Sequence, residues 1–279
     1  MLVRTISGII AVIVVIALLT VNFYFGIVAS IALCILAALA TYEMLHNTGC
    51  VKNVALNVIA MVYAAGTQLL YNLDRAYNFE HPVVAISTVA YVVIVAFFAV
   101  FAHKSVGERQ ITMAIAMPIA IAYAYAAFES LLNSADGHGL FYFALLLNFS
   151  SVADTSAYFV GKAFGKHKLA PVVSPKKTIE GSVGGILGSL IGAVIFCFGY
   201  EFIAKGVDVN LLILLAITPV MCVLGMIGDL FTSAIKRNYG IKDYGNLIPG
   251  HGGILDRTDS LLLVAPVLAL VIQFVEIVK

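Results

Sequence analysis

Nine long apolar segments constrain this chain more strongly than any other feature of its sequence. A helix needs about 20 predominantly apolar residues to cross a hydrocarbon core about 30 Å thick. The chain is 62% hydrophobic and only 11% charged, whereas soluble domains are about 45–50% apolar. The sequence therefore predicts an all-α integral membrane protein with about nine transmembrane helices. The expected spans are Ile6–Val21, Phe25–Leu45, Val54–Leu73, Pro82–Phe101, Ile111–Leu132, Leu140–Phe159, Val183–Phe202, Leu211–Ile235 and Leu261–Val278.

No soluble domain, low-complexity linker or long repeat separates these segments, so residues 1–279 are predicted to form one polytopic membrane domain. Within it, residues 1–135 hold the N-terminal spans and residues 136–279 carry the polar motifs. The N-terminus places Arg4 before an apolar run, as a signal peptide does, but it lacks a small-x-small cleavage site. A retained first span is therefore the prediction.

Basic residues are distributed unequally between the two sides of this predicted domain. With nine spans, 13 of the 16 lysines and arginines fall on the side that holds the N-terminus and the loops after spans two, four, six and eight. Only Arg75, Lys205 and Lys279 fall on the opposite side. Because cytoplasmic loops carry the excess of basic residues, the first side is predicted to be cytoplasmic.

Net charge, cysteine spacing and missing motifs disfavour several other classes of protein. The formal net charge is +1, so charge gives no reason to expect a nucleic acid or an acidic protein as partner. The cysteines at 34, 50, 197 and 222 are scattered without CxxC spacing and are predicted to be small core residues. No HExxH, GxSxG, GxGxxG or Walker A pattern occurs, which disfavours hydrolases and P-loop enzymes.

Two carboxylates lie inside predicted spans, where a charge costs about 2.5–3.5 kcal/mol at mid-membrane. Asp154 lies in the sixth span. Asp229 lies late in the eighth, with Ser233 one turn on and Lys236 and Arg237 two turns on. Each acid is expected to face a wet cavity, a cation or a basic partner, and an ion pair of Asp229 with a lysine or arginine is the structural alternative. The polar face of the sixth span also includes Asn148, Ser151, Thr155 and Tyr158.

The most concentrated polar motif is "GHGGILDRTDS", immediately before the last apolar segment. Its glycines, Gly250, Gly252 and Gly253, are expected to allow tight turns and the close approach of a ligand to exposed backbone N–H groups. His251 lies between them and suits three roles: a general acid, a donor to phosphate or a turn residue. The sequence does not decide among these roles.

Two acids of this motif, Asp256 and Asp259, are three residues apart, so a short helical turn would direct both to one site with Arg257 to the side. Together with Asp229 they offer the hard oxygen ligands that suit Mg²⁺, which takes one or two carboxylates combined with substrate phosphates. These three acids are therefore the predicted metal ligands. Capping of the last helix is the structural alternative.

A second polar loop contains "SPKKTIEG" at residues 174–181. Ser174 and Pro175 are typical of an N-cap followed by the first residue of a helix, so they predict a short helix whose free N–H groups and Lys176 and Lys177 form a phosphate site. A helix start at the membrane interface with snorkelling lysines is the structural alternative. The glycines that follow are expected to allow close helix packing: Gly181, Gly184, Gly185, Gly188 and Gly192.

The residues from Ser233 to Asp259 resemble the C-terminal signature of phosphatidate cytidylyltransferases, also called CDP-diacylglycerol synthases. The "SPKKTIEG" segment and Asp154 are also similar to that family, whereas the first 130 residues match it only in being apolar spans. The signature spans 27 residues with many fixed positions. It reads Ser233-x-Ile-Lys236-Arg237, four residues, then Lys242-Asp243-x-Gly245-x-x-Ile248-Pro249-x-His251-Gly252-Gly253-Ile254-x-Asp256-Arg257-Thr258-Asp259.

This resemblance implies a nucleotidyltransferase of phospholipid biosynthesis that transfers the cytidylyl group of CTP to phosphatidic acid, giving CDP-diacylglycerol and pyrophosphate. It implies a multi-pass protein of the bacterial cytoplasmic (inner) membrane, with a polar, cytoplasm-facing site between the C-terminal helices. Mg²⁺ is the implied cofactor, and a second metal ion and a homodimer are left open.

The resemblance also assigns roles to residues. Asp229 and Asp256, with Asp259 in support, would hold the metal. The remaining expected catalytic residues, which would bind the phosphates of the two substrates, are Lys236, Arg237, Lys242 and Arg257. The expected substrate-binding residues are Asp154, Ser174, Lys176, Lys177, Ser233, Asp243, His251, Gly252 and Gly253.

Two other functions fit parts of the pattern. A related CTP-using enzyme, such as a polyprenol kinase or a synthase that uses archaeal ether lipids, would retain much of the same site. A transporter of an anionic substrate would also have buried acids and glycine-broken spans. The two halves of the chain show no pair of corresponding broken spans, which disfavours the transporter.

Overall fold

The computed structural model describes residues 2–25, 27–134 and 136–279. Several side chains near the N-terminus, including that of Arg4 on the predicted cytoplasmic side, lie outside this description. The chain divides into two compact units. Unit 1 comprises residues 1–129 and 238–258, and unit 2 comprises residues 130–237 and 259–279. The segment 238–258, which holds most of the predicted signature, therefore groups with the N-terminal spans.

Within the described residues, seven helices are long and apolar enough to cross a membrane, which confirms the prediction of a helical, multi-pass membrane protein. Two of them contain one π-helical turn each, labelled η1 and η2. The seven are α2 (Val28–Tyr42) with η1 (Glu43–Asn47), α3 (Val54–Tyr77), α4 (Val83–Phe101), α5 (Glu108–Leu132), α6 (Gly139–Leu147) with η2 (Asn148–Val152) and α7 (Ala153–Phe164), α8 (Ile179–Ile203) and α9 (Leu211–Asn238).

The first and last of the nine expected spans are not among these seven. α1 (Leu2–Phe25) is a continuous helix whose described apolar stretch is Ile13–Asn22, and α11 (Leu261–Phe274) has 14 residues. At 1.5 Å per residue, α11 is about 21 Å long, which is shorter than a hydrocarbon core of about 30 Å. The predicted end at Val278 is wrong because the chain leaves the helix and Val278 pairs with Val209 in an antiparallel bridge.

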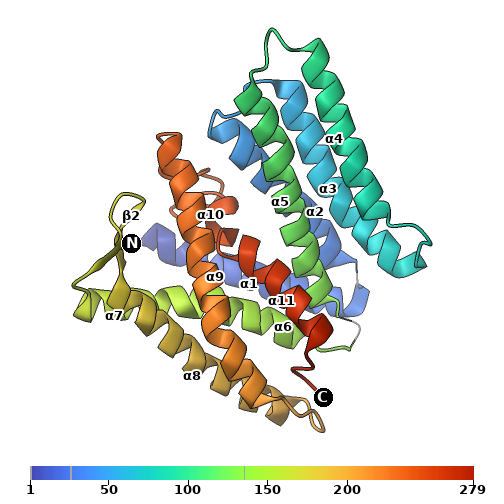
Figure 1. Ribbon diagram of the computed structural model, residues 1–279. Coiled ribbons are helices and arrows are strands. Elements are labelled where there is room, and N and C mark those ends of the chain that lie inside the picture. Colours follow the sequence, from blue (N-terminus) through green and yellow to red (C-terminus); the bar gives the residue numbers. More distant parts are fainter. Residues whose placement is uncertain (1, 26, 135) are drawn as a thin grey trace. The chain divides into compact units, whose positions relative to one another are not determined.

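In unit 1, α3 packs against both α2 and α4 (Figure 1). α3 begins where the Asn53 side chain accepts a hydrogen bond from the Leu56 N–H (3.2 Å), and it ends at Asn78 in the left-handed conformation. Such caps satisfy backbone groups that the helix itself leaves unpaired. The stacked rings of Tyr63 and Tyr91, with centroids 4.0 Å apart, join α3 to α4. The four-residue helix α10 (Leu255–Thr258) also belongs to this unit.

In unit 2, the closest packing is between α7 and α8, which run side by side in Figure 1. A β-carbon on Gly185 would lie 2.9 Å from the Ala153 carbonyl oxygen, and one on Gly188 would overlap the Ser156 side chain. The glycines of α8 therefore permit contact between two helix backbones, as in other small-residue membrane interfaces. This confirms the packing role predicted for them.

The predicted helix at Ser174 is wrong. Ser174–Thr178 forms strand β2, which pairs antiparallel with β1 (Lys168–Ala170), so the fold is not purely helical. Pro175 suits a strand here because a two-stranded sheet has only edge strands, where a missing N–H is tolerated. The next helix, α8, is instead capped by Thr178, whose hydroxyl accepts a hydrogen bond from the Gly181 N–H (3.1 Å).

Candidate active site

In unit 1, Asp256 folds the signature loop back on itself. Its side chain is buried, and Oδ2 accepts hydrogen bonds from the N–H groups of Tyr244 (2.7 Å) and Gly253 (3.0 Å). A β-carbon on Gly252 would lie 2.9 Å from the same oxygen. The α10 turn predicted around Asp256 is present, and Arg257 on it is exposed, as expected. The carboxylate thus has a structural task in the loop, in addition to any chemistry.

A second carboxylate, Glu43 of η1, binds the same loop. Its Oε1 accepts from the Ile254 N–H (3.0 Å) and its Oε2 from the Leu255 N–H (2.9 Å). Glu43 is only 4% exposed. No motif in the sequence marks Glu43, although a lone acid near the end of an apolar span is the signal that identified Asp154 and Asp229.

Glycine is required in this loop for two different structural reasons. Gly250 (φ +76°) and Gly252 (φ +90°) occupy the left-handed region, as the predicted tight turns require. Gly253 is not in that region, but a β-carbon there would overlap the Glu43 carboxylate. The N–H groups of Gly253, Ile254 and Leu255 bond to the two carboxylates, so the expectation that this part of the loop exposes them to a ligand is wrong.

Three further contacts hold the signature segment within unit 1. The Asn47 side chain donates to the carbonyl of the buried Tyr244 (2.9 Å), and a hydrogen bond of 3.0 Å joins the hydroxyls of Tyr125 and Thr258. His251 lies in a turn in which its N–H donates to the Ile248 carbonyl (2.9 Å). Its ring is half-buried. The other predicted site residues of this segment, Lys242 and Asp243, are exposed.

In unit 2, Asp229 of α9 forms an ion pair with Lys177 of β2. Ser233, one turn further along α9, donates a hydrogen bond to the other carboxylate oxygen of Asp229 (3.3 Å). The ion pair that the sequence left as the structural alternative is therefore present, and it joins a predicted metal ligand to a predicted phosphate ligand. The two side chains are partly exposed, but the Lys177 Nζ atom itself is buried.

Asp259 follows α10 and precedes α11, and its surroundings disfavour the charged carboxylate. Burial is the main cause that raises the pKa of Asp259 to about 7, and the negative charges of Asp229 and Asp154 add to it. The positive charge of the buried Lys236 acts in the opposite direction. Unit 2 therefore gathers three carboxylates and the cations Lys177 and Lys236 into one electrostatic cluster.

The remaining predicted residues of unit 2 lie around this cluster. Lys176 is exposed and lies on the opposite face of β2 from Lys177, because successive strand side chains alternate, so the prediction that both lysines face one space is wrong. Ser174 pairs with Ala170 in the hairpin. The Arg237 Nε donates to the Val173 carbonyl (3.3 Å), which ties the end of α9 to the hairpin.

The polar face predicted for the sixth span is divided by the π-helical turn η2. Asn148 is buried and its side-chain amide donates to the Ser189 carbonyl of α8 (3.0 Å). Ser151, Asp154 and Tyr158 are exposed. Because an extra residue in a helical turn shifts all later side chains around the axis, Asn148 serves helix packing while the charge of Asp154 acts on Asp259 in the cluster.

The acids of unit 2 suit a magnesium ion whose remaining ligands come from a bound substrate. Asp229 and Asp259 repel each other, and a divalent cation would relieve that repulsion. Among the described residues, no group of three or more histidine, cysteine, aspartate or glutamate side chains is arranged to hold a metal alone. Mg²⁺ commonly takes one or two carboxylates and completes its shell with phosphates and water. The third predicted ligand, Asp256, belongs to unit 1.

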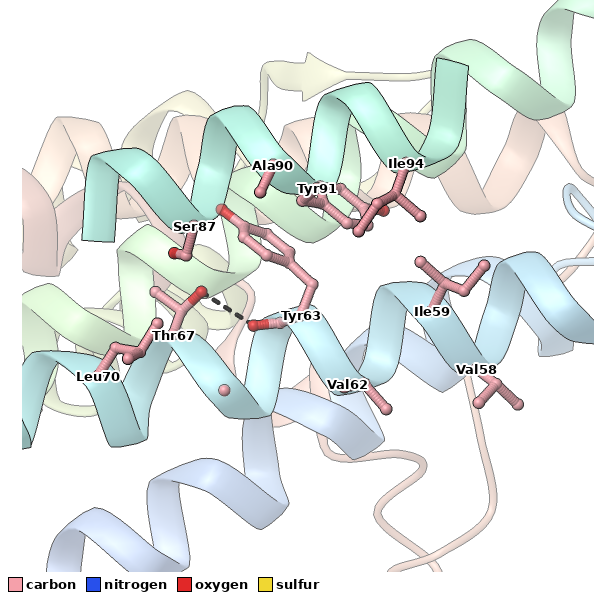
Figure 2. Close-up of a pocket in the computed structure, with 11 residues that line it drawn as sticks. Val58, Ile59, Val62, Tyr63, Thr67, Leu70, Ser87, Ala90, Tyr91 and Ile94 are labelled. Atoms are coloured by element: carbon pink, nitrogen blue, oxygen red, sulfur yellow. Dashed lines mark hydrogen bonds between the residues drawn. The ribbon is translucent and has the colours of Figure 1, made fainter. Parts of the chain in front are cut away.

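A pocket of about 420 Å³ lies between α3 and α4 in unit 1 (Figure 2). Its wall includes Val62, Tyr63, Tyr91 and Ile94, and the Thr67 hydroxyl beside them donates to the Tyr63 carbonyl (2.9 Å). The lining contains no charged residue and none of the predicted site residues. This mainly apolar lining therefore lacks the positive charge that phosphate chemistry needs.

Comparison with known proteins agrees with the signature. The sequence profile described as "Cytidylyltransferase family" matches residues 2–275. A phosphatidate cytidylyltransferase of Staphylococcus aureus (strain COL) is 35% identical over 268 residues, which are 96% of this chain and 97% of the relative. One of Bacillus subtilis (strain 168) is 47% identical over 139 residues, 49% of each chain. The likeness to the first relative extends through the apolar spans that carry no recognisable motif.

Proposed function

The chain belongs to the cytidylyltransferase family, and we propose that the carboxylates and lysines described above carry out its chemistry. Its activity is the transfer of the cytidylyl group of CTP to phosphatidate, which gives CDP-diacylglycerol and pyrophosphate. CTP and phosphatidate are therefore its substrates, and the apolar helices place it in a membrane. The observation that carries the proposal is the cluster of Lys177, Asp229, Lys236 and Asp259 in unit 2.

The reaction needs charge neutralisation more than proton transfer. A phosphate oxygen of phosphatidate attacks the α-phosphorus of CTP, the bond from that phosphorus to the β-phosphate oxygen breaks, and pyrophosphate leaves with the electron pair. The attacking phosphate is already anionic at neutral pH, so no strong general base is required. The main barrier is the approach of two polyanions, which preorganised positive charges lower.

In this proposal, the Lys177–Asp229 ion pair is the resting arrangement of the site. Each partner holds the other in place while no substrate is present. When CTP binds, Lys177 turns to a phosphate oxygen, and Lys236 offers a second positive charge. Because the Lys177 Nζ atom is buried in the resting pair, this step requires the lysine side chain to move.

Asp229 and Asp259 would hold Mg²⁺ together with the phosphates of CTP, and Asp256 is the third proposed ligand from the signature. Bound Mg²⁺ supplies positive charge to the phosphates and aligns the α-phosphate for in-line displacement. Support for this assignment comes from the mutual repulsion of Asp229 and Asp259, which leaves the cluster short of positive charge. Lys242 and Arg257 are exposed and remain candidates for binding substrate phosphates.

We further propose that the site faces the cytoplasm in the cytoplasmic membrane of a bacterium. Seven successive crossings would leave the segments after η1, α4, α7 and α9 on one side of the membrane, and these segments with the adjoining helix ends carry most of the basic residues. The positive-inside rule assigns that side to the cytoplasm. CTP is a cytoplasmic metabolite, which agrees with this orientation.

An assay of the products formed by the purified protein in detergent tests this function. We expect pyrophosphate release from CTP that depends on added phosphatidate and stops in excess chelator, with one CDP-diacylglycerol per pyrophosphate. Release of CDP with a phosphorylated lipid would indicate a kinase and contradict the proposal. Turnover that persists in chelator would contradict the metal assignment alone.

A further inference from the structure

We propose that Glu43 is a positioning residue for the active-site loop that carries Asp256. This inference rests on the proposed role of Asp256 in the chemistry. Glu43 lies at the end of the second helical span, and its two partners, Ile254 and Leu255, directly precede Asp256. The residue would act through the loop and would not itself touch a substrate.

The contact uses both oxygens of Glu43. Oε1 accepts from the Ile254 N–H and Oε2 from the Leu255 N–H, at 3.0 and 2.9 Å. Two adjacent N–H groups thus meet one carboxylate, in a fixed geometry that a single hydrogen bond would not impose. Charged acceptors make stronger hydrogen bonds than neutral ones, and burial at 4% exposure protects the contact from water.

The surrounding backbone is shaped to admit this carboxylate. A β-carbon on Gly245 would lie 2.5 Å from Glu43 Oε1, and one on Gly253 would overlap Oε2. Neither glycine has a positive φ, so backbone conformation does not explain why they are glycine. Space for the Glu43 side chain does explain it, and both glycines belong to the predicted signature.

Glu43 and Asp256 therefore fix the loop from two sides. Asp256 binds the N–H groups of Tyr244 and Gly253, and Glu43 binds the two N–H groups that follow. If Glu43 released the loop, the α10 turn could shift and carry Asp256 with it. Displacement of a reacting group by about 1 Å can cost about 10²-fold in rate.

Glu43→Gln tests the proposal because it keeps the shape of the side chain but replaces one acceptor with a donor. We expect kcat to fall about 10- to 100-fold, while KM for CTP and for phosphatidate each changes less than about threefold. Glu43→Asp, which keeps the charge, should recover part of the loss. It also serves as the second variant if the glutamine protein fails to fold.

Glu129→Gln is the matched control. Glu129 is also a buried glutamate of a span in unit 1, 1% exposed, and it accepts hydrogen bonds from Ser30 and Asn72. It has no contact with the signature segment among those described. We expect Glu129→Gln to keep kcat within about threefold of wild type even where it lowers the melting temperature as much as Glu43→Gln.

Gly253→Ala approaches the same contact from the loop side, since its methyl group would displace the Glu43 carboxylate. We expect a similar fall in kcat. The Glu43→Gln/Gly253→Ala double variant should show little further loss, because both substitutions break the same interaction. Hydrogen exchange should rise at Ile254 and Leu255 in either single variant. This readout is independent of activity.

Normal kcat in Glu43→Gln, an equal loss in Glu129→Gln, or fully additive losses in the double variant would each overturn the proposal. Asp256→Asn separates this failure from failure of the proposed site. If Asp256→Asn is inactive while Glu43→Gln turns over normally, only the positioning role is wrong. If Asp256→Asn itself is fully active, the loop is not part of the chemistry.

Discussion

The Asp256 carboxylate holds the backbone of the signature loop, and we propose that it also serves the active site. Asp256 closes the signature loop through two backbone N–H groups, and it is also one of the three proposed metal ligands. To separate these two roles, a substitution must remove the negative charge and keep the hydrogen bonds to the backbone. Asparagine does this, because its side-chain oxygen can still accept the two N–H groups.

Asp256→Asn is expected to lower the rate of CDP-diacylglycerol formation by at least about 10²–10³-fold, the usual loss when one strong electrostatic contact to the transition state is removed. Its melting temperature in detergent should stay close to that of wild type. The measurement is turnover beside thermal unfolding of the same preparation. A stable variant with near-normal turnover would return Asp256 to a purely structural role.

Asp259 predicts a pH dependence of stability in the metal-free protein. Its pKa is raised from 3.8 to about 7 on folding, so between these values the folded state binds more protons than the unfolded state. Stability therefore falls as the pH rises from about 4 to 7. Asp259→Asn should remove this contribution, which thermal unfolding in chelator at several pH values would measure. An unchanged pH profile would contradict the assignment.

At the scale of elements, the hairpin places two neighbouring lysines on opposite faces of a strand, whereas a helix would have separated them by only about 100°. Strand β2 directs Lys177 to Asp229 and leaves Lys176 exposed. We expect Lys177→Gln to reduce turnover roughly 10²-fold, and Lys176→Gln to reduce it by less than about fivefold, as a solvated charge would. Steady-state rates of the two variants are the measurement. Equal losses would mean that the alternation of the strand does not govern phosphate binding.

The contact between α7 and α8 predicts opposite effects for two glycines of one helix. A β-carbon on Gly184 would overlap Val160 of α7, whereas one on Gly199 would meet nothing within 4 Å. Gly184→Ala should cost about 1–3 kcal/mol through overpacking, and Gly199→Ala should gain up to about 1 kcal/mol of helix propensity. Thermal unfolding in detergent compares them. A neutral Gly184→Ala would show that α7 and α8 can separate without loss.

At the scale of the whole molecule, the charge asymmetry predicts which residues an external reagent can reach. Lys168, in β1, lies on the side proposed to be cytoplasmic, and Lys205, after α8, on the other. In a cysteine-free background, Lys205→Cys should react in intact cells with an impermeant thiol reagent, and Lys168→Cys should react only after the cells are opened. Ready labelling of Lys168→Cys from outside would reverse the proposed orientation.

The sequence by itself determined the class of the fold, seven of the nine spans predicted from it, and the family. These properties depend on the length and hydrophobicity of local segments and on the order of residues in a motif, which need no knowledge of distant contacts. Gly184 and Gly188 were predicted to be packing residues for the same reason, since small residues in an apolar helix indicate a helix interface.

Only the tertiary structure decided which partners the polar residues take. Glu43 lies 211 residues from Ile254 in the sequence, and no local pattern near either residue indicates the contact. The hairpin replaced the predicted helix at Ser174 because a strand depends on its pairing partner, here Lys168–Ala170. Asp229 forms its ion pair with Lys177, which lies in a distant strand. Helix α11 ends before Val278, which pairs with Val209. Each of these outcomes depends on which distant segment is adjacent in space, which no local segment of the sequence records.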